Sequence, residues 1–121
     1  MNRPSIELAV EFNRVVREDD EQFDEPDELN RVAQALNSIE AVEEPTEAAA
    51  VLAYRVTRAQ GFAEGNKRTA LLLARWVLDH NGVDGTQILP PADREFADLL
   101  VQAASGIEVQ AEMISLLASR R

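Results

Sequence analysis

The sequence contains no cysteine, so it can form neither a disulfide nor a thiolate metal site, and it carries no mark of its redox compartment. It also has no run approaching the roughly 20 apolar residues that a helix needs to span a bilayer. No apolar signal segment follows the opening residues 1–4. These absences argue against a disulfide scaffold and against a membrane protein, and they make the cytoplasm the expected location.

Basic residues are scarce, with 12 Lys and Arg against 22 Asp and Glu, which gives a net charge of −10. A general nucleic-acid binder needs a basic face to displace counterions, so direct binding to nucleic acid is not expected. The acidity is concentrated in residues 18–28, which hold eight acids and no base, and the rest of the chain carries a net charge of −2. We expect residues 18–25 to form an exposed loop, and a solvated linker is favoured over a docking role.

A chain of 121 residues with 45% hydrophobic residues is expected to form one globular domain over residues 1–121. Apolar residues recur at helical spacing and show little alternation at period two, which predicts an all-α fold. The predicted helices cover residues 5–17, 26–39, 46–59, 65–81, 93–105 and 108–118. The connection 83–91 is expected to be irregular, with a short extended piece at residues 87–89.

Local start and stop signals support these boundaries. Ser5, Thr46 and Asp93 are candidate N-caps, and Pro26 is suited to the first turn of a helix. Gly106 is expected to end the helix before it. On the helix at 46–59, Tyr54 and Arg55 are assigned to the rim of the core rather than to the wall of a site.

The helix predicted at about 65–81 is expected to be the buried centre of the bundle. Residues 71–81 contain almost no helix breakers, and apolar side chains occur on nearly every face. Gly65 and Asn66 lie at its entrance, where Asn is a favoured cap, and Gly82 lies just past its end.

Two cations at the start of this helix are unexpected. Lys67 and Arg68 fall in the first turn, beside the positive end of the helix dipole, where a cation is disfavoured by roughly 0.3–1 kcal/mol. An anion bound by free backbone N–H groups, Lys67 and Arg68 would explain them. A capped helix whose cations extend into solvent explains them equally well, and the residues alone do not decide between the two.

The run from Phe62 to Ala70 resembles the core motif of the Fic/Doc family, H-x-F-x-[D/E]-[G/A]-N-[G/K]-R. Lys67, where Fic enzymes carry Gly, and Leu71, where many carry a second Arg, are similar to the Doc (death-on-curing) branch. The resemblance continues to Asn81-Gly82-Val83 and returns in residues 96–106, so that it covers roughly residues 26–119.

The resemblance implies ATP and Mg²⁺ as cofactors and gives each loop residue a chemical role. Glu64 is a hard oxygen ligand suited to Mg²⁺, and a first-turn acid that complements the helix dipole is the less favoured alternative. Gly65, Asn66, Lys67 and Arg68 are expected to bind phosphate, Asn66 through its amide and Arg68 in a bidentate manner. Phe62 is expected to be a core plug.

The main departure from the motif is Gln60, which stands where the family has its catalytic His. A neutral amide cannot act as a general base, a contribution typically worth about 10²–10⁴-fold. The only histidine, His80, is roughly 20 Å along the helix and too far away to replace it. Three explanations of Gln60 remain. It is an introduced inactivating substitution, or a natural change that leaves a protein able to bind a nucleotide or a partner. The least favoured explanation is a site that works without a protein base.

The Doc resemblance implies the toxin of a toxin–antitoxin pair that transfers a phosphoryl or AMP group to a hydroxyl of a protein, with activity impaired by Gln60. The expected target is a translation elongation factor, and the expected partner is an antitoxin that lies over the groove near the motif. No S/T-x-x-x-E-G/N stretch for internal inhibition is present, so an inhibitor is expected to come from another chain. A non-catalytic module of the same fold, binding a nucleotide or a partner, is the alternative.

Overall fold

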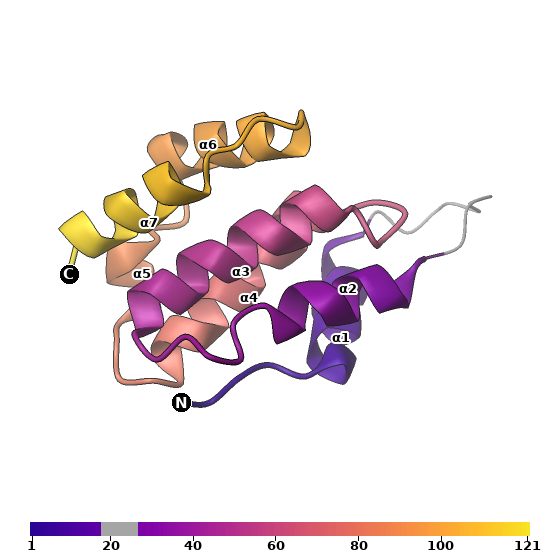
Figure 1. Cartoon of the computed structure of the whole chain (residues 1–121), viewed down its shortest axis with the longest axis horizontal. Coiled ribbons are helices and arrows are strands. Elements are labelled where there is room, and N and C mark those ends of the chain that lie inside the picture. The colour runs from indigo at the N-terminus through magenta and orange to yellow at the C-terminus, as the bar shows by residue number, and fades with distance from the viewer. Residues whose placement is uncertain (18–26) are drawn as a thin grey trace.

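The computed structural model describes residues 1–17 and 27–121. Within these two ranges the chain forms helices and no strand, which confirms the predicted all-α class (Figure 1). The helices are α1 (Ile6–Val16), α2 (Leu29–Asn37), α3 (Pro45–Ala59), α4 (Asn66–Asp79), α5 (Gly85–Ile88), α6 (Arg94–Ala104) and α7 (Gln110–Ser119).

Helices α3 and α4 form the centre of the bundle and pack against each other most extensively (Figure 1). On their other sides, α3 contacts α2, α6 and α7, whereas α4 contacts α1, α5 and α6. Small residues line both helices, which lets the two backbones approach closely. The fully buried alanines are Ala48, Ala49, Ala50 and Ala53 on α3 and Ala70 and Ala74 on α4.

The helix at 65–81 was predicted to be central, and α4 confirms this within two residues at each end. Leu73 is fully buried, and Trp76 is partly buried against the core. α3 shares the central position, since more of its residues are buried than those of α4.

Several predicted boundaries are confirmed by hydrogen bonds. The side chain of Ser5 accepts from Leu8 N–H, and that of Asp93 accepts from Phe96 N–H. α6 ends at Ala104, and Gly106 follows its cap with a φ of 92°, which lets the N–H of Ile107 return to the carbonyl of Gln102.

Four predicted boundaries are wrong. Residues 87–89 are not extended, because Asp84 caps the short helix α5 by accepting from Thr86 N–H and Gln87 N–H. The third helix is capped by Glu44, one residue before Pro45, and not by Thr46. The last helix begins at Gln110 instead of residue 108.

The second helix begins at Leu29, later than predicted, and the predicted first-turn residue Pro26 lies outside the described residues. Glu28 is held out of the helix because its N–H donates to the carbonyl of Gly61 at 2.6 Å. The predicted exposed loop at 18–25 also lies outside the described residues.

None of the helices in the described part of the chain is both long enough and apolar enough to cross a membrane.

Candidate functional site

The loop at residues 60–65 joins the two central helices. It contains the first part of the motif to which catalytic, metal-binding and phosphate-binding roles were assigned from the sequence. It begins at Gln60, which caps α3 with φ 47° and ψ 45°. Among the described residues Gln60 is the one non-glycine with positive φ, a conformation that costs roughly 1–2 kcal/mol. Its exposed side chain donates from Nε2 to the carbonyl of Ala104 at 3.1 Å, so the end of α6 helps to hold it.

Gly61 lets the loop approach the start of α2. A Cβ at this position would lie 2.6 Å from Val32 Cγ2 and 2.9 Å from the carbonyl oxygen of Glu28. Any larger residue would therefore push the loop and α2 apart.

Phe62 and Asn66 close the loop on itself. The N–H of Phe62 donates to Asn66 Oδ1 at 3.1 Å, and Asn66 Nδ2 donates back to the carbonyl of Phe62 at 2.9 Å. The phenyl ring is buried, with 3% of Phe62 exposed, which agrees with the predicted core plug. Both polar atoms of the Asn66 amide therefore bond to the loop backbone, and Nδ2 keeps a second hydrogen for another acceptor.

A buried asparagine on α1 supports the loop from behind. Asn13 is 1% exposed, and its Nδ2 donates to the carbonyl of Glu64 at 2.8 Å and to Thr69 Oγ1 at 3.1 Å. A Cβ on Gly65 would lie only 3.0 Å from the same nitrogen, so this position requires glycine for space as well as for its φ of 80°.

Asp27 holds the loop from the other side. Its Oδ1 accepts from Ala63 N–H at 2.8 Å and from Arg17 Nη2 at 2.8 Å, while Oδ2 accepts from Arg17 Nη1 at 3.2 Å. Partial burial opposes ionisation, but the hydrogen bonds from Arg17 and Ala63 prevail and lower the pKa of Asp27 below its ordinary value. Arg17 and Asp27 also join the two points at which the described chain stops and resumes.

Sequence reasoning missed Asn13, Arg17 and Asp27. Asn13 could have been noticed as a polar residue that follows Ala9 by one helical turn on the apolar face of the first helix. Asp27 was counted only as part of the acidic run, and nothing in its local sequence distinguishes it from its acidic neighbours.

The first turn of α4 presents donors and positive charge together. Gly65 provides no side-chain cap, and the first N–H groups of a helix have no acceptor within the helix. Lys67 and Arg68 are exposed in the same turn, and Glu64 is partly exposed just before it. The structure therefore brings Glu64, Gly65, Asn66, Lys67 and Arg68 to one helix start, with Gln60 at the far end of the same loop.

His80 lies at the opposite end of α4, as predicted. It caps the helix C-terminus, its Nδ1 is 2.9 Å from the carbonyl of Trp76, and its ring stacks on the Trp76 ring with centroids 4.1 Å apart. It takes no part in the loop.

The start of α4 therefore combines a glycine, an asparagine and two cations at a helix terminus that has no side-chain cap. The chain matches the sequence model of the Fic/DOC family over residues 11–78, more than half of its length, and it belongs to this family. No curated protein and no solved structure is similar enough to the chain to count as a match. The matched range includes the loop and α4 but not α6, so the resemblance of residues 96–106 stays a prediction.

Proposed function

We propose that this chain is a Doc-like toxin fold that binds ATP at the start of α4 and transfers a phosphoryl or AMP group to a hydroxyl of a protein, with activity impaired by Gln60. The observation that carries the proposal is the exposed first turn of α4, which has no side-chain cap and carries both Lys67 and Arg68. Lys67 and Leu71 favour the Doc branch and phosphoryl transfer.

The anion site is built from main-chain and side-chain donors. The N–H groups of Asn66, Lys67 and Arg68 point along the helix axis towards its start, where the dipole adds positive potential. A guanidinium binds phosphate through two parallel hydrogen bonds, whereas an ammonium acts as a point charge. Arg68 is therefore assigned to orientation of the phosphates and Lys67 to charge.

Glu64 fits a metal ion that arrives with the nucleotide. Within residues 1–17 and 27–121 no group of three or more His, Cys, Asp and Glu is placed to hold a metal by itself. Mg²⁺ needs only one or two carboxylates when phosphates and water provide its other ligands. When bound, Mg²⁺ supplies neutralisation of the phosphate charge.

Gln60 is assigned to the place of the family's catalytic His. Its Nε2 donates to Ala104, so the amide is held at the mouth of the loop but cannot accept a proton from a hydroxyl at neutral pH. The remaining residues position the phosphates, and the proton of the target hydroxyl has no protein acceptor. We therefore expect slow transfer or none.

A second function is supported by the same hydrogen bond. The amide of Gln60 ties the loop to α6, a structural role that suits a non-catalytic module of the family, one that binds a nucleotide or a partner without reaction. Expression of the Gln60→His variant alone in a bacterial host distinguishes the two, because a binding module should remain harmless to growth whereas a restored transferase should inhibit it.

The partners proposed from the Doc assignment are an antitoxin that covers the groove near residues 60–68 and a protein target, for which a translation elongation factor is the first candidate. The net charge of −10 favours protein partners over nucleic acid. A genome in which no small antitoxin-like reading frame lies beside this one would weaken this part of the proposal.

Titration calorimetry with ATP and Mg²⁺ tests the nucleotide site. Binding should be measurable at millimolar nucleotide, and Arg68→Ala should weaken it about tenfold, since a hydrogen bond to a charged group contributes roughly 1.5–3 kcal/mol. Arg14→Ala is the matched control, because Arg14 is an exposed arginine on α1 whose partner among the described residues is the neighbouring Glu11. Absence of binding, or equal affinity of the Arg68→Ala variant, would exclude the site.

A further inference from the structure

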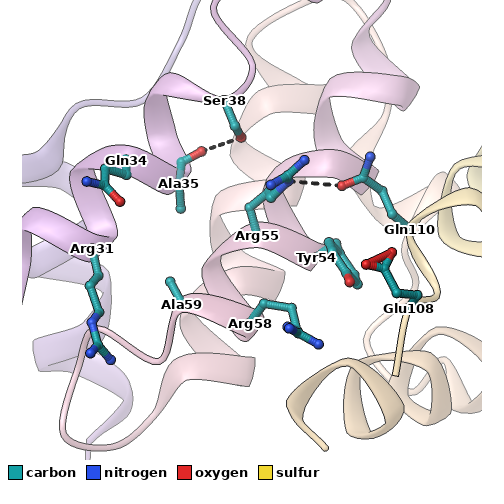
Figure 2. Close-up of a pocket in the computed structure, with 10 residues that line it drawn as sticks. All are labelled: Arg31, Gln34, Ala35, Ser38, Tyr54, Arg55, Arg58, Ala59, Glu108 and Gln110. Carbon is teal, nitrogen blue, oxygen red and sulfur yellow. Dashed lines mark hydrogen bonds between the residues drawn. The ribbon is translucent and has the colours of Figure 1, made fainter. Parts of the chain in front are cut away.

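A second concave site, a groove of about 530 Å³, lies between α2, α3 and the segment that enters α7 (Figure 2). Tyr54 and Ala35 are its buried lining residues and form its floor, and Ala59 and Gln110 are partly exposed. Residues 60–68 do not line it, so it is separate from the first turn of α4. Tyr54 and Arg55 were assigned to the rim of the core; Tyr54 is buried in the core beneath this groove, and the exposed Arg55 lines its wall.

Three arginines surround the floor. Arg31 comes from α2, and Arg55 and Arg58 come from α3, with the small side chains of Ala35 and Ala59 between them in Figure 2. Glu108 is the one acidic residue among the lining residues. The groove therefore has a local excess of positive charge in a chain whose net charge is −10.

The three guanidinium groups are engaged to different extents. Arg31 pairs with Glu28 at 3.0 Å, an exposed pair that contributes little, and Arg55 donates from Nε to Gln110 Oε1 at 3.1 Å. Arg58 makes no hydrogen bond or ion pair with the part of the chain that the structure describes. Arg58, which has no partner among the described residues, and the two weakly held arginines beside it are arranged to receive an anion from outside.

We propose that this groove binds an acidic peptide segment of a partner protein, with Arg58 as the principal contact and Arg31 and Arg55 beside it. The proposal does not depend on nucleotide binding at α4, since the two sites share no residue.

The exposure of the lining favours a peptide over a small anion. Arg31, Gln34, Arg55 and Arg58 are all exposed, so a small molecule would keep much of its surface in water, although the volume alone would admit one. Small-ligand sites bury about 70–90% of the ligand. A peptide can instead span from α2 to α7, accepting hydrogen bonds from the arginines through its carboxylates and from Gln34 and Gln110 through its backbone.

Charge also makes the site selective. The rest of this acidic chain repels acidic peptides. Their electrostatic interaction with the chain is therefore favourable only where cations are clustered. Association that depends on this cluster should weaken steeply as salt rises, because exposed charges are screened beyond about 10 Å at 0.1 M ionic strength.

The test uses the full chain and a fluorescein-labelled peptide of ten glutamates, with fluorescence anisotropy as the readout at low and at physiological salt. A labelled peptide of ten glutamines is the control for non-ionic binding. The variants are Arg58→Glu in the groove and Arg14→Glu on α1, both reversals of an exposed arginine, and thermal unfolding confirms that each variant is folded.

We expect the glutamate peptide to bind the native chain and the Arg14→Glu variant equally, and the Arg58→Glu variant at least tenfold more weakly. Lack of binding to the native chain, or equal binding to the Arg58→Glu variant, would overturn the proposal. Full displacement of the peptide by equimolar pyrophosphate would show a small-anion site instead. Dimerisation of the native chain that Arg58→Glu abolishes would assign the groove to a second copy.

Discussion

The amide nitrogen of Asn13 lies 2.8 Å from the carbonyl oxygen of Glu64, a residue 51 positions further along the chain. Through this contact α1 fixes the backbone immediately before the first turn of α4. The same nitrogen is 3.1 Å from Thr69 Oγ1, so one buried side chain spans the loop and the helix that the loop enters. The geometry of the candidate anion site is therefore set by a helix outside the motif.

Replacing Asn13 with Ala should destabilise the fold and loosen the loop. The change leaves the carbonyl of Glu64 and the hydroxyl of Thr69 without a donor in a buried site, which costs about 1–3 kcal/mol. Urea denaturation measures the loss. Asn30→Ala is the control, because Asn30 is exposed on α2 and should change the free energy of unfolding by no more than about 0.5 kcal/mol. Equal effects of the two substitutions would contradict the assigned role of Asn13.

Asp27→Asn should reduce stability in a way that depends on pH. The pKa of Asp27 is lowered in the folded chain, so its stabilising contribution is complete above the unfolded pKa of about 3.9 and is lost as the pH falls through the folded value. We expect the native chain to be more stable than the variant by about 1 kcal/mol at pH 7. The difference should disappear at a pH well below 3.9, as measured by urea denaturation across the pH range. A difference that stays constant down to that pH would mean that the charge of Asp27 is not what matters.

Gly61→Ala should separate the loop from the start of α2. The added methyl would lie within 3 Å of Val32 Cγ2 and of the carbonyl oxygen of Glu28, and relief of such a clash costs about 1–3 kcal/mol. The hydrogen bond from Glu28 N–H to Gly61 should weaken, which amide hydrogen exchange at Glu28 reports directly. Gly82→Ala is a useful comparison, since a Cβ there meets no atom within 4 Å and only its φ of 82° is strained. Fast exchange at Glu28 is expected in the Gly61 variant alone.

The sequence predicted the longer helices, but it predicted neither the short helix α5 nor the contacts that place the loop. Apolar spacing and capping residues predicted α1, α4 and α6 because these signals lie within a few residues of one another. The start of α2 was misplaced because the N–H of Glu28 donates to the carbonyl of Gly61, an acceptor 33 positions away in the sequence. The spacing of apolar residues cannot predict a hydrogen bond between residues so far apart in the sequence.

The residues of the candidate site also divide into those predicted from local sequence and those that only the tertiary structure reveals. Residues 64–68 were identified because they are consecutive and their types are unusual at a helix start. Asn13 and Asp27 reach the loop only through the packing of α1 and of residues 27–28 against it, which depends on tertiary structure. The arginine groove was missed for the same reason, because Arg31 and Arg58 lie on different helices.

The measurement that tests the central claim most directly compares the chain with its Gln60→His variant in one transfer assay. A histidine is well suited to the positive φ at this position and has a pKa near 6.5, so it would supply a general base at neutral pH. The readouts are label transferred to proteins of a cell extract from γ-labelled ATP, for phosphoryl transfer, and from α-labelled ATP, for AMP transfer. The Gln60→His/Arg68→Ala double variant is the control for phosphate binding.

We expect little or no labelling by the chain as it stands, a gain on the order of 10²-fold or more in the Gln60→His variant, and loss of that gain in the double variant. If the chain labels a target as well as the Gln60→His variant does, no protein base is needed and the mechanism is wrong. If neither labels a target although nucleotide binds, the chain is the non-catalytic module.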